Sequence, residues 1–141
     1  MAVYDAQLQN TARNTRQYTD LDLFFGKKSS NSDIQTITDV QAVKRSIRNL
    51  VQLNTYDKPF HPEIAGGIRQ MLFENMTPTV AIIISKQLEQ VIANYEPRAK
   101  LVGIRAIPDY DKNLYNVNIE FYVVNTPTEL VDMSVMLERL R

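Results

Sequence analysis

The chain has 141 residues, with 16 basic and 16 acidic side chains, one histidine and no cysteine. Its length fits a single domain that is large enough to fold without a disulfide or a metal. The lack of cysteine excludes a disulfide scaffold, a cysteine nucleophile and a thiolate metal site, and the single histidine excludes an all-histidine zinc site within one chain. Zero net charge argues against broad binding to nucleic acid, which needs a basic surface.

The first part of the chain shows no targeting signal. Residues 1–17 are rich in Gln, Asn, Thr and Arg and lack the apolar core of a signal peptide. The longest apolar run, Val80 to Ile84, is far shorter than the ~20 residues that span a bilayer. We therefore expect a protein that is made in a cytoplasm and has no membrane partner. Residues 1–17 form a polar arm, either a disordered leader or a segment that becomes ordered on a partner.

A short strand and a helix are predicted next. Polar and apolar side chains alternate near residues 20–25, which predicts a strand with Leu21, Leu23 and Phe25 on one face. After a polar loop, Thr38 to Gln41 has the spacing of a capping box. The helix that begins there has one apolar stripe, which consists of Val40, Val43, Ile47, Leu50 and Val51. Its basic residues, Arg45 among them, lie off this stripe. A solvated helix face is the favoured interpretation, and a contact to an acidic partner is the alternative.

Two further helices are expected in the middle of the chain. The segment Asn54 to Gly67 contains two prolines and two glycines, which indicates a shaped loop, and we expect Phe60 and Ile64 to anchor it to the core. A short helix with Ile68 directed inward follows. Thr77 and Pro78 then predict the start of a long helix that runs to about Tyr95 and is stopped by Pro97.

An antiparallel hairpin of residues 100–107 and 114–124 is predicted from two alternating segments joined by a turn. In the first strand Val102, Ile104 and Ala106 share one face. In the second, alternate residues from Tyr115 to Val123 face the core, and the other face is exposed to water. The residues expected on that wet face are Asn116, Asn118, Glu120 and Tyr122.

The last segment, residues 126–141, is predicted to be a helix or an arm. Its start has capping-box spacing, and apolar residues recur at helical spacing from Leu130 to Leu140. The fold class is therefore α+β, a small antiparallel sheet made of the hairpin and the N-terminal strand, packed against two or three helices. The organisation is a polar arm (1–17), a core domain (18–125) and a C-terminal helix or arm (126–141).

No pattern for catalysis stands out. Sixteen acidic residues will always place some pair close together, but no spacing marks an acid and a nucleophile. Ser85 lies inside a predicted helix without the Gly-x-Ser-x-Gly turn, and His61 has no evident partner. A phosphate-binding glycine motif is missing from the sequence. We therefore predict no catalytic residue, no metal site and no cofactor.

The junction from Tyr95 to Arg98 is the most unusual feature. Glu96 and Arg98 flank Pro97 at the end of the long helix. A proline turn can present such a charged pair in a defined geometry. The alternative interpretation is a helix stop with incidental charges.

Several segments, taken in order, carry a family resemblance: Tyr18–Phe24, Asp39–Leu50, Pro59–Gly66, Leu72–Glu74, Tyr95–Arg98 and Val117–Phe121. Together they resemble the baseplate wedge, or sheath-initiator, family of contractile phage tails. Relatives of this family occur in contractile injection and type VI secretion machines. The resemblance covers Tyr18 to Asn125. The chain departs from it at Asn54 to Asp57, where family members often have a glycine-containing turn.

The resemblance implies a structural protein of the tail baseplate, not an enzyme, which resides in the virion after assembly in the host cytoplasm. It implies that the chain joins the wedge core to the tail sheath and templates the first sheath ring by strand exchange. The tail tube or hub is a further candidate partner, and several copies, with six expected, would occupy each baseplate ring. The alternative is a lysozyme-like peptidoglycan hydrolase associated with the baseplate, which a turbidity assay on purified cell walls would reveal.

Site residues follow from the same resemblance. It places the wedge contact at Glu96, Pro97 and Arg98, with Arg98 as the anchor because its planar guanidinium binds carboxylates or carbonyls in fixed geometry. Arg98→Ala is then expected to leave the domain folded and to block its incorporation into wedges. The hypothetical contacts to the sheath lie on the wet strand face, at Asn116, Asn118, Glu120 and Tyr122.

Overall fold

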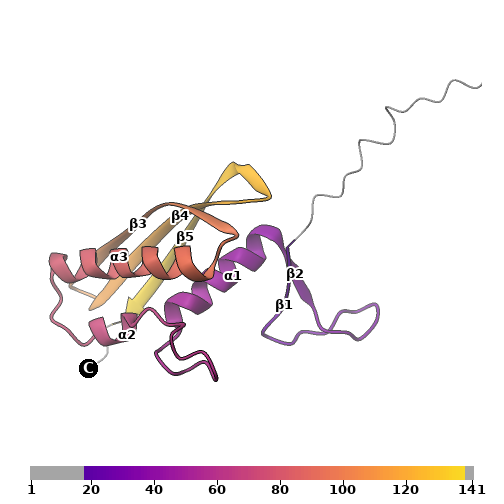
Figure 1. The fold of residues 1–141 in the computed structure, drawn as a ribbon, viewed down its shortest axis with the longest axis horizontal. Helices are drawn as coiled ribbons and strands as arrows, with labels where there is room; N and C mark the ends of the chain where they lie inside the picture. Colours follow the sequence, from indigo (N-terminus) through magenta and orange to yellow (C-terminus); the bar gives the residue numbers. More distant parts are fainter. Residues whose placement is uncertain (1–17, 139–141) are drawn as a thin grey trace, which may run out of the picture.

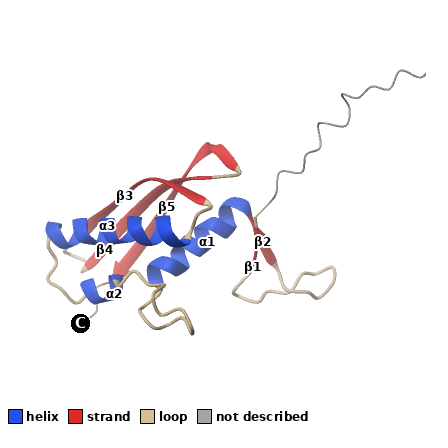
Figure 2. Ribbon diagram, in the orientation of Figure 1, coloured by secondary structure: helices blue, strands red, loops and turns tan. Residues whose placement is uncertain are grey.

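The computed structural model describes residues 18–138, and Figure 1 shows their arrangement. The elements in chain order are β1 (Thr19–Leu21), β2 (Thr36–Thr38), α1 (Asp39–Gln52), α2 (Ile68–Met71), α3 (Pro78–Tyr95), β3 (Ala99–Asp109), β4 (Leu114–Val123) and β5 (Thr126–Glu138). Helices and strands are mixed along the chain, and every strand pairing is antiparallel (Figure 2). The predicted α+β class is confirmed. The arm predicted at residues 1–17 lies outside the described residues.

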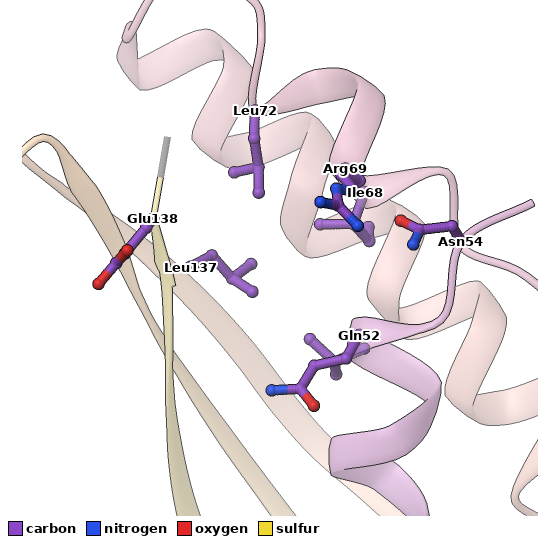
Figure 3. A pocket seen from close by; sticks show the side chains of 8 residues that line it. Gln52, Asn54, Ile68, Arg69, Leu72, Leu137 and Glu138 are labelled. Carbon is purple, nitrogen blue, oxygen red and sulfur yellow. The ribbon is translucent and has the colours of Figure 1, made fainter. Parts of the chain in front are cut away.

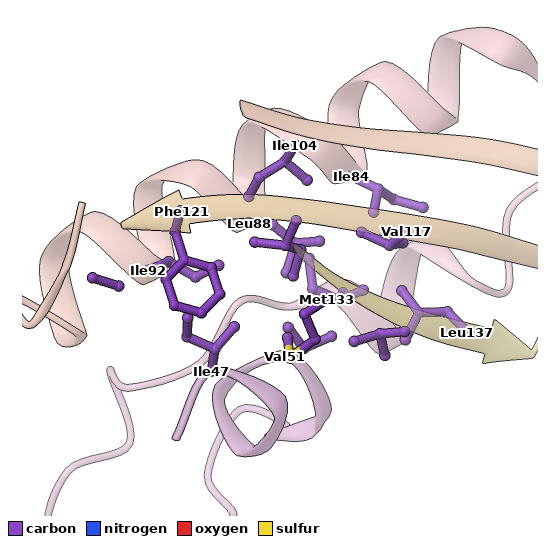
Figure 4. Close-up of a cluster of buried hydrophobic side chains, with 14 of the residues drawn as sticks. Ile47, Val51, Ile84, Leu88, Ile92, Ile104, Val117, Phe121, Met133 and Leu137 are labelled. Atoms are coloured by element: carbon purple, nitrogen blue, oxygen red, sulfur yellow. The ribbon is translucent and has the colours of Figure 1, made fainter. Parts of the chain in front are cut away.

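The main sheet has three strands in the order β3-β4-β5. The hairpin of β3 and β4 matches the prediction. Alternate residues of β4 from Tyr115 to Val123 are completely buried, which confirms the predicted core face. Figure 4 shows Phe121 on this face between Ile47 of α1 and Ile92 of α3. The hydrophobic core therefore lies between one face of the sheet and the helices.

A bulge in β3 changes the predicted face of one residue. The register with β4 shifts between Leu101 and Gly103. One extra residue reverses the side-chain alternation, since strand side chains have a period of two. Ile104 faces the core as predicted, but Val102 is 54% exposed. The prediction for Val102 is therefore wrong.

The predicted C-terminal helix is also wrong, because residues 126–138 form strand β5 at the edge of the main sheet. Val131, Met133, Val135 and Leu137 are buried, and the residues between them are exposed. This period of two coexists in the sequence with a weaker helical period. Pairing with β4 satisfies one edge of the strand, and its apolar face packs in the core cluster with residues of the helices. The segment is thus part of the sheet, and Leu140 lies outside the described residues.

The N-terminal strand does not join the main sheet. β1 pairs with β2 in a separate two-stranded sheet. It ends at Leu21, because Asp22 begins a turn in which its Oδ1 accepts the Phe24 N–H at 3.2 Å. Leu23 and Phe25 lie beyond the strand, and they and Leu21 are more than half exposed, so the predicted shared strand face is wrong. β1 is too short to bury three alternate residues.

The helices begin and end close to their predicted limits. α1 buries Val43, Ile47 and Val51 of its predicted stripe. α3 starts where Thr77 Oγ1 accepts the Val80 N–H at 3.2 Å. In the loop before α2, however, Phe60 is 96% exposed, so it does not anchor the loop. Phe60 has a positive φ of 67°, a backbone conformation that is uncommon outside glycine.

Candidate functional site

The end of α3 turns sharply at Glu96. The Ala99 N–H donates to the Glu96 carbonyl at 3.1 Å, which closes a turn with Pro97 at its second position. This turn buries Glu96, which is 2% exposed, and leaves Pro97 exposed. Arg98 Nε lies 2.6 Å from Glu96 Oε1, and Nη2 lies 2.9 Å from Oε2. The result is a bidentate ion pair across the turn.

The N-terminal sheet joins this corner through Asp20 on β1. Arg98 Nη1 donates to the two carboxylate oxygens of Asp20 at 3.0 and 3.1 Å, across 78 residues of sequence. The guanidinium also lies over the Tyr18 ring, 5.5 Å from its centroid. We define Glu96, Pro97, Arg98 and Asp20 as the acidic corner. Asp20 was not predicted as a site residue, because nothing in the local sequence identifies so distant a partner.

Glu96 and Arg98 of the acidic corner are both charged at neutral pH. Burial raises the pKa of Glu96, but hydrogen bonds from Arg98 and Ser46 and the guanidinium charge together bring this pKa below its usual value. The hydrogen bonds from Arg98 to Glu96 and Asp20 raise the pKa of the guanidinium, so Arg98 stays charged. The sequence prediction placed Glu96 and Arg98 together correctly, and the structure adds that their charges are paired within the chain.

A second ion pair holds the same N-terminal segment to α1. Arg45 Nη1 lies 2.7 Å from Asp22 Oδ1, and the Arg45 guanidinium lies 4.7 Å from the centre of the Phe24 ring. Asp22 is itself buried, at 9% exposure. Arg45 is therefore not on a freely solvated helix face, as the sequence favoured. In the Asp-Leu-Asp pattern of residues 20–22, Asp20 pairs with Arg98 and Asp22 pairs with Arg45. The alternation of acidic and apolar residues was the only feature of the sequence that could have indicated these two ion pairs.

The predicted sheath-side residues lie on the outer face of β4, away from the core. Asn118 is exposed, and Asn116, Glu120 and Tyr122 are half-buried. Because β4 is the central strand, its backbone already pairs with β3 and β5. Only the side chains of this row are available to a partner. An added strand must pair with β3 or β5 instead.

Comparison with known proteins gives one clear relative. The chain is 29% identical over 126 residues to the baseplate wedge protein gp25 of Enterobacteria phage T4, which covers 89% of this chain and 95% of that protein. The chain is a homologue of this baseplate wedge protein. The resemblance predicted from the sequence is thereby confirmed. No protein-family model matches the chain.

Two solved structures share the fold of this chain. One is described as a tail lysozyme from Geobacter sulfurreducens and has a TM-score of 0.66 at 20% identity, over 72% of this chain and 91% of its own. The other is the baseplate of the anti-feeding prophage, with a TM-score of 0.61 at 18% identity over 89% of this chain and 88% of the matched chain. With the T4 relative, the baseplate structure supports a structural role in a contractile tail.

The described part of this chain shows little that suggests catalysis or metal binding. Residues 18–138 contain no group of three or more His, Asp or Glu side chains placed to hold a metal. None of the described helices is long and apolar enough to cross a membrane. A backbone hydrogen bond and His61, 3.0 Å away, lower the pKa of Glu63. A general acid needs the opposite shift, and the pKa of Glu96 is also lowered.

The stability of this protein should fall in acid because of Glu96. A carboxyl whose pKa is lower in the folded than in the unfolded chain stabilises the fold above its unfolded pKa, here about 4.5. This stabilisation is lost as the pH falls through the folded pKa. We expect Glu96→Gln to flatten the decline in urea midpoint between neutral pH and about pH 3. Glu89→Gln, at an exposed position on α3, is the matched control and should decline as the wild type does. Equal slopes for all three proteins would contradict the role of Glu96.

Proposed function

We propose that this chain is a structural protein of a contractile tail baseplate that joins the wedge core to the sheath and templates the first sheath ring by strand exchange. The observation that carries the proposal is the similarity to the T4 baseplate wedge protein over 95% of that protein's length. In this proposal it resides in the virion after assembly in the host cytoplasm, with six copies in each baseplate ring. The tail tube or hub is a further candidate contact.

The acidic corner is the proposed contact to the wedge core. An arginine has five N–H donors. Within residues 18–138, Nε and Nη2 of Arg98 each donate once to Glu96, and Nη1 donates to both carboxylate oxygens of Asp20, so Nη2 has one further N–H for a partner acceptor. Pro97 projects next to them and is exposed. The internal ion pairs fix the guanidinium, so a partner would meet a preorganised surface.

The open main sheet supports strand exchange. A three-stranded sheet has two edges whose backbone groups can pair with another strand. The proposed sheath-side row of Asn116, Asn118, Glu120 and Tyr122 lies on the outer face between those edges. A strand added at either edge would extend the sheet beside this row, and the side chains of the row would then contact the body of the sheath subunit.

Pro97→Asp tests the wedge contact while keeping both ion pairs of Arg98. The second position of the common β-turn is compatible with most residues, aspartate included, but an unpaired charge buried at an interface is costly. We expect the variant protein to fold normally and its incorporation into baseplates to fall by roughly tenfold or more, the effect of about 1.4 kcal/mol. Particles are assembled with each variant as the only source of the protein. Quantitative mass spectrometry measures the amount of the variant in the particles, and electron microscopy measures the fraction of sheathed tails.

Pro78→Asp is the matched control for this experiment. Pro78 is also exposed but begins α3 at the other end of the helix, where an acidic residue is favourable. It should give normal sheathed tails. Normal sheathed tails with Pro97→Asp would contradict the assigned wedge contact. Normal sheathed tails in the absence of the chain would contradict the proposed function as a whole.

A lysozyme-like hydrolase is the alternative function. It is favoured only by the likeness to the Geobacter sulfurreducens structure, which at 20% identity concerns the fold. Retaining glycosidases need an acid with a raised pKa beside a nucleophile. The acidic corner instead pairs two carboxylates with one arginine, which contributes to lowering the pKa of Glu96. The structural role therefore has the stronger support.

A further inference from the structure

Residues 18–38 are attached to the rest of the protein mainly by polar contacts. We call this segment the strap; it contains β1, β2 and the loop between them. Figure 1 shows it at the N-terminal end of α1, apart from the main sheet. None of the apolar side chains of the strap is buried, and Asp22 is the one buried residue within it. Of the strap residues, Tyr18 alone packs against the hydrophobic core, and it is half-buried.

Two aspartates hold the strap closed. Asp20 accepts hydrogen bonds from Arg98 Nη1 at 3.0 and 3.1 Å, and Asp22 Oδ1 lies 2.7 Å from Arg45 Nη1. Water reaches both pairs, since the side chain of Asp20 is 35% exposed and that of Arg45 is 28% exposed. Ion pairs that water can reach contribute only modestly to stability. The strap is therefore held closed by contacts of modest strength.

The other end of α1 is attached to the body of the protein in a different way. Four buried apolar side chains line a pocket of about 230 Å³ there, beside Asn54 (Figure 3): Val51, Ile68, Leu72 and Leu137. Neither of the two Asp–Arg ion pairs contributes to this pocket. Movement of the strap would therefore leave the contacts around the pocket in place.

The junction between the strap and α1 has the properties of a hinge. β2 ends at Thr38 and α1 begins at Asp39, so no loop separates them. Asp39 has a φ of 46°, in the left-handed region that residues other than glycine seldom adopt. The Asp39 N–H donates to the Tyr18 carbonyl at 2.7 Å, and the Tyr18 N–H donates to Asp39 Oδ1 at 3.1 Å. A change in φ at Asp39 would release this strain and move the strap away from α1.

We propose that the strap opens as a unit about Asp39, and that Asp20 in the closed state blocks the binding of a partner's acidic group to Arg98. In the closed state the Asp20 carboxylate occupies Nη1 of Arg98. In the open state Glu96 still holds Nε and Nη2, so the guanidinium keeps its orientation and offers Nη1 to a carboxylate of the partner. The contact with Asp20 is thus autoinhibitory. This inference rests on the proposed wedge contact at Arg98 and adds its regulation.

Amide hydrogen exchange of the full chain, followed by NMR, tests the opening. Asp20→Asn removes a charge at nearly constant shape and leaves Arg98 in place. We expect exchange to become roughly three- to tenfold faster at the amides of β1, β2 and Asp39. These amides exchange from the open state, because an isolated two-stranded sheet is marginal in water. The amides of the main sheet and of Ile68 and Leu72 at the pocket should keep their rates.

A second variant opens the strap without changing the acidic corner. Arg45→Gln breaks the ion pair with Asp22 and should accelerate exchange at the same amides. Asp111→Asn is the matched control, because Asp111 is exposed in the turn between β3 and β4 and has no ion pair in the described structure. It should change none of these rates. Unchanged exchange in either strap variant, or equal acceleration of the strap and the main sheet, would overturn the proposal.

Competition during assembly tests whether the closed strap blocks Arg98. Wild type and one variant are supplied in equal amounts, in excess over the available baseplate positions. A closed strap lowers the apparent affinity of the chain by the fraction that is open. Both strap variants should therefore be enriched over wild type by roughly threefold or more in assembled particles, as measured by quantitative mass spectrometry, and Asp111→Asn should not be. A strap that only stabilises the fold predicts depletion, so depletion or equal amounts of either strap variant would overturn the proposal.

The result is distinguishable from failure of the proposed function. Hydrogen exchange needs neither a baseplate nor a partner, and Pro97→Asp tests the wedge contact itself. If Pro97→Asp blocks assembly and the strap variants are not enriched, the wedge contact stands and the autoinhibitory role of Asp20 is wrong. If Pro97→Asp gives normal sheathed tails, the wedge contact is wrong, and the role of Asp20 is wrong with it.

Discussion

Replacing Arg98 with alanine is expected to lower the free energy of unfolding by about 3 kcal/mol, the lower end of the range for breaking a buried ion pair. The variant would leave the Glu96 carboxylate, only 2% exposed, without its guanidinium partner. It would also release Asp20 and with it the tie between β1 and the end of α3. Urea unfolding followed by circular dichroism measures the effect.

Two further variants separate the lost ion pair from the lost side chain. Arg105→Ala removes an arginine from an exposed position of β3 that has no ion pair in the described structure, and it should change stability by less than about 0.5 kcal/mol. Glu96→Leu combined with Arg98→Ala removes both charges, so this double variant should be more stable than Arg98→Ala alone. If Arg98→Ala is no more destabilising than Arg105→Ala, the buried pair does not stabilise the fold.

The ion pairs of Arg98 revise what its replacement can reveal about assembly. From the sequence alone, Arg98→Ala was expected to leave the domain folded and to block incorporation into wedges. The structure shows Arg98 engaged with Glu96 and Asp20, so its loss would impair folding and any partner contact together. Pro97→Asp avoids this ambiguity, because Pro97 contributes no charge to the corner. The wedge contact is therefore better tested at Pro97.

Features encoded locally were predicted well. The proline after Thr77 and the one after Glu96 bracket α3, and the buried row of β4 follows from strict alternation between Tyr115 and Val123. In each case the spacing of the apolar residues and the residues that start and end the element predict the same structure. The pairing of Glu96 with Arg98 was also predictable, since a turn of fixed geometry joins them.

Features that depend on distant contacts were missed. The segment of β5 carries both a helical and a strand period, and the open edge of β4 selects the strand. Asp20 meets Arg98 across 78 residues, which no local pattern encodes. The pocket beside Asn54 combines α1, α2 and β5, so only the folded chain assembles it. Phe60 is apolar but exposed, and its positive φ is not encoded in the proline and glycine pattern of the loop.

Phe121→Ala is expected to lower the free energy of unfolding by about 4 kcal/mol, the cost of emptying a large buried site. Phe121 is completely buried on the central strand, and Figure 4 shows it between Ile47 and Ile92. It thus joins the sheet to both long helices. β4 is held on both sides by β3 and β5, so the backbone has little freedom to close the cavity. Urea unfolding measures the loss.

Tyr122→Ala is the matched control, because the adjacent aromatic residue lies half-buried on the outer face of the same strand. Its replacement should cost about 1 kcal/mol or less. The contrast matters for function as well as stability. The proposed sheath-side row includes Tyr122, so this variant should fold well and still weaken sheath attachment, whereas Phe121→Ala should reduce both stability and incorporation. If the two variants are equally destabilised, the assignment of the inner and outer faces is wrong.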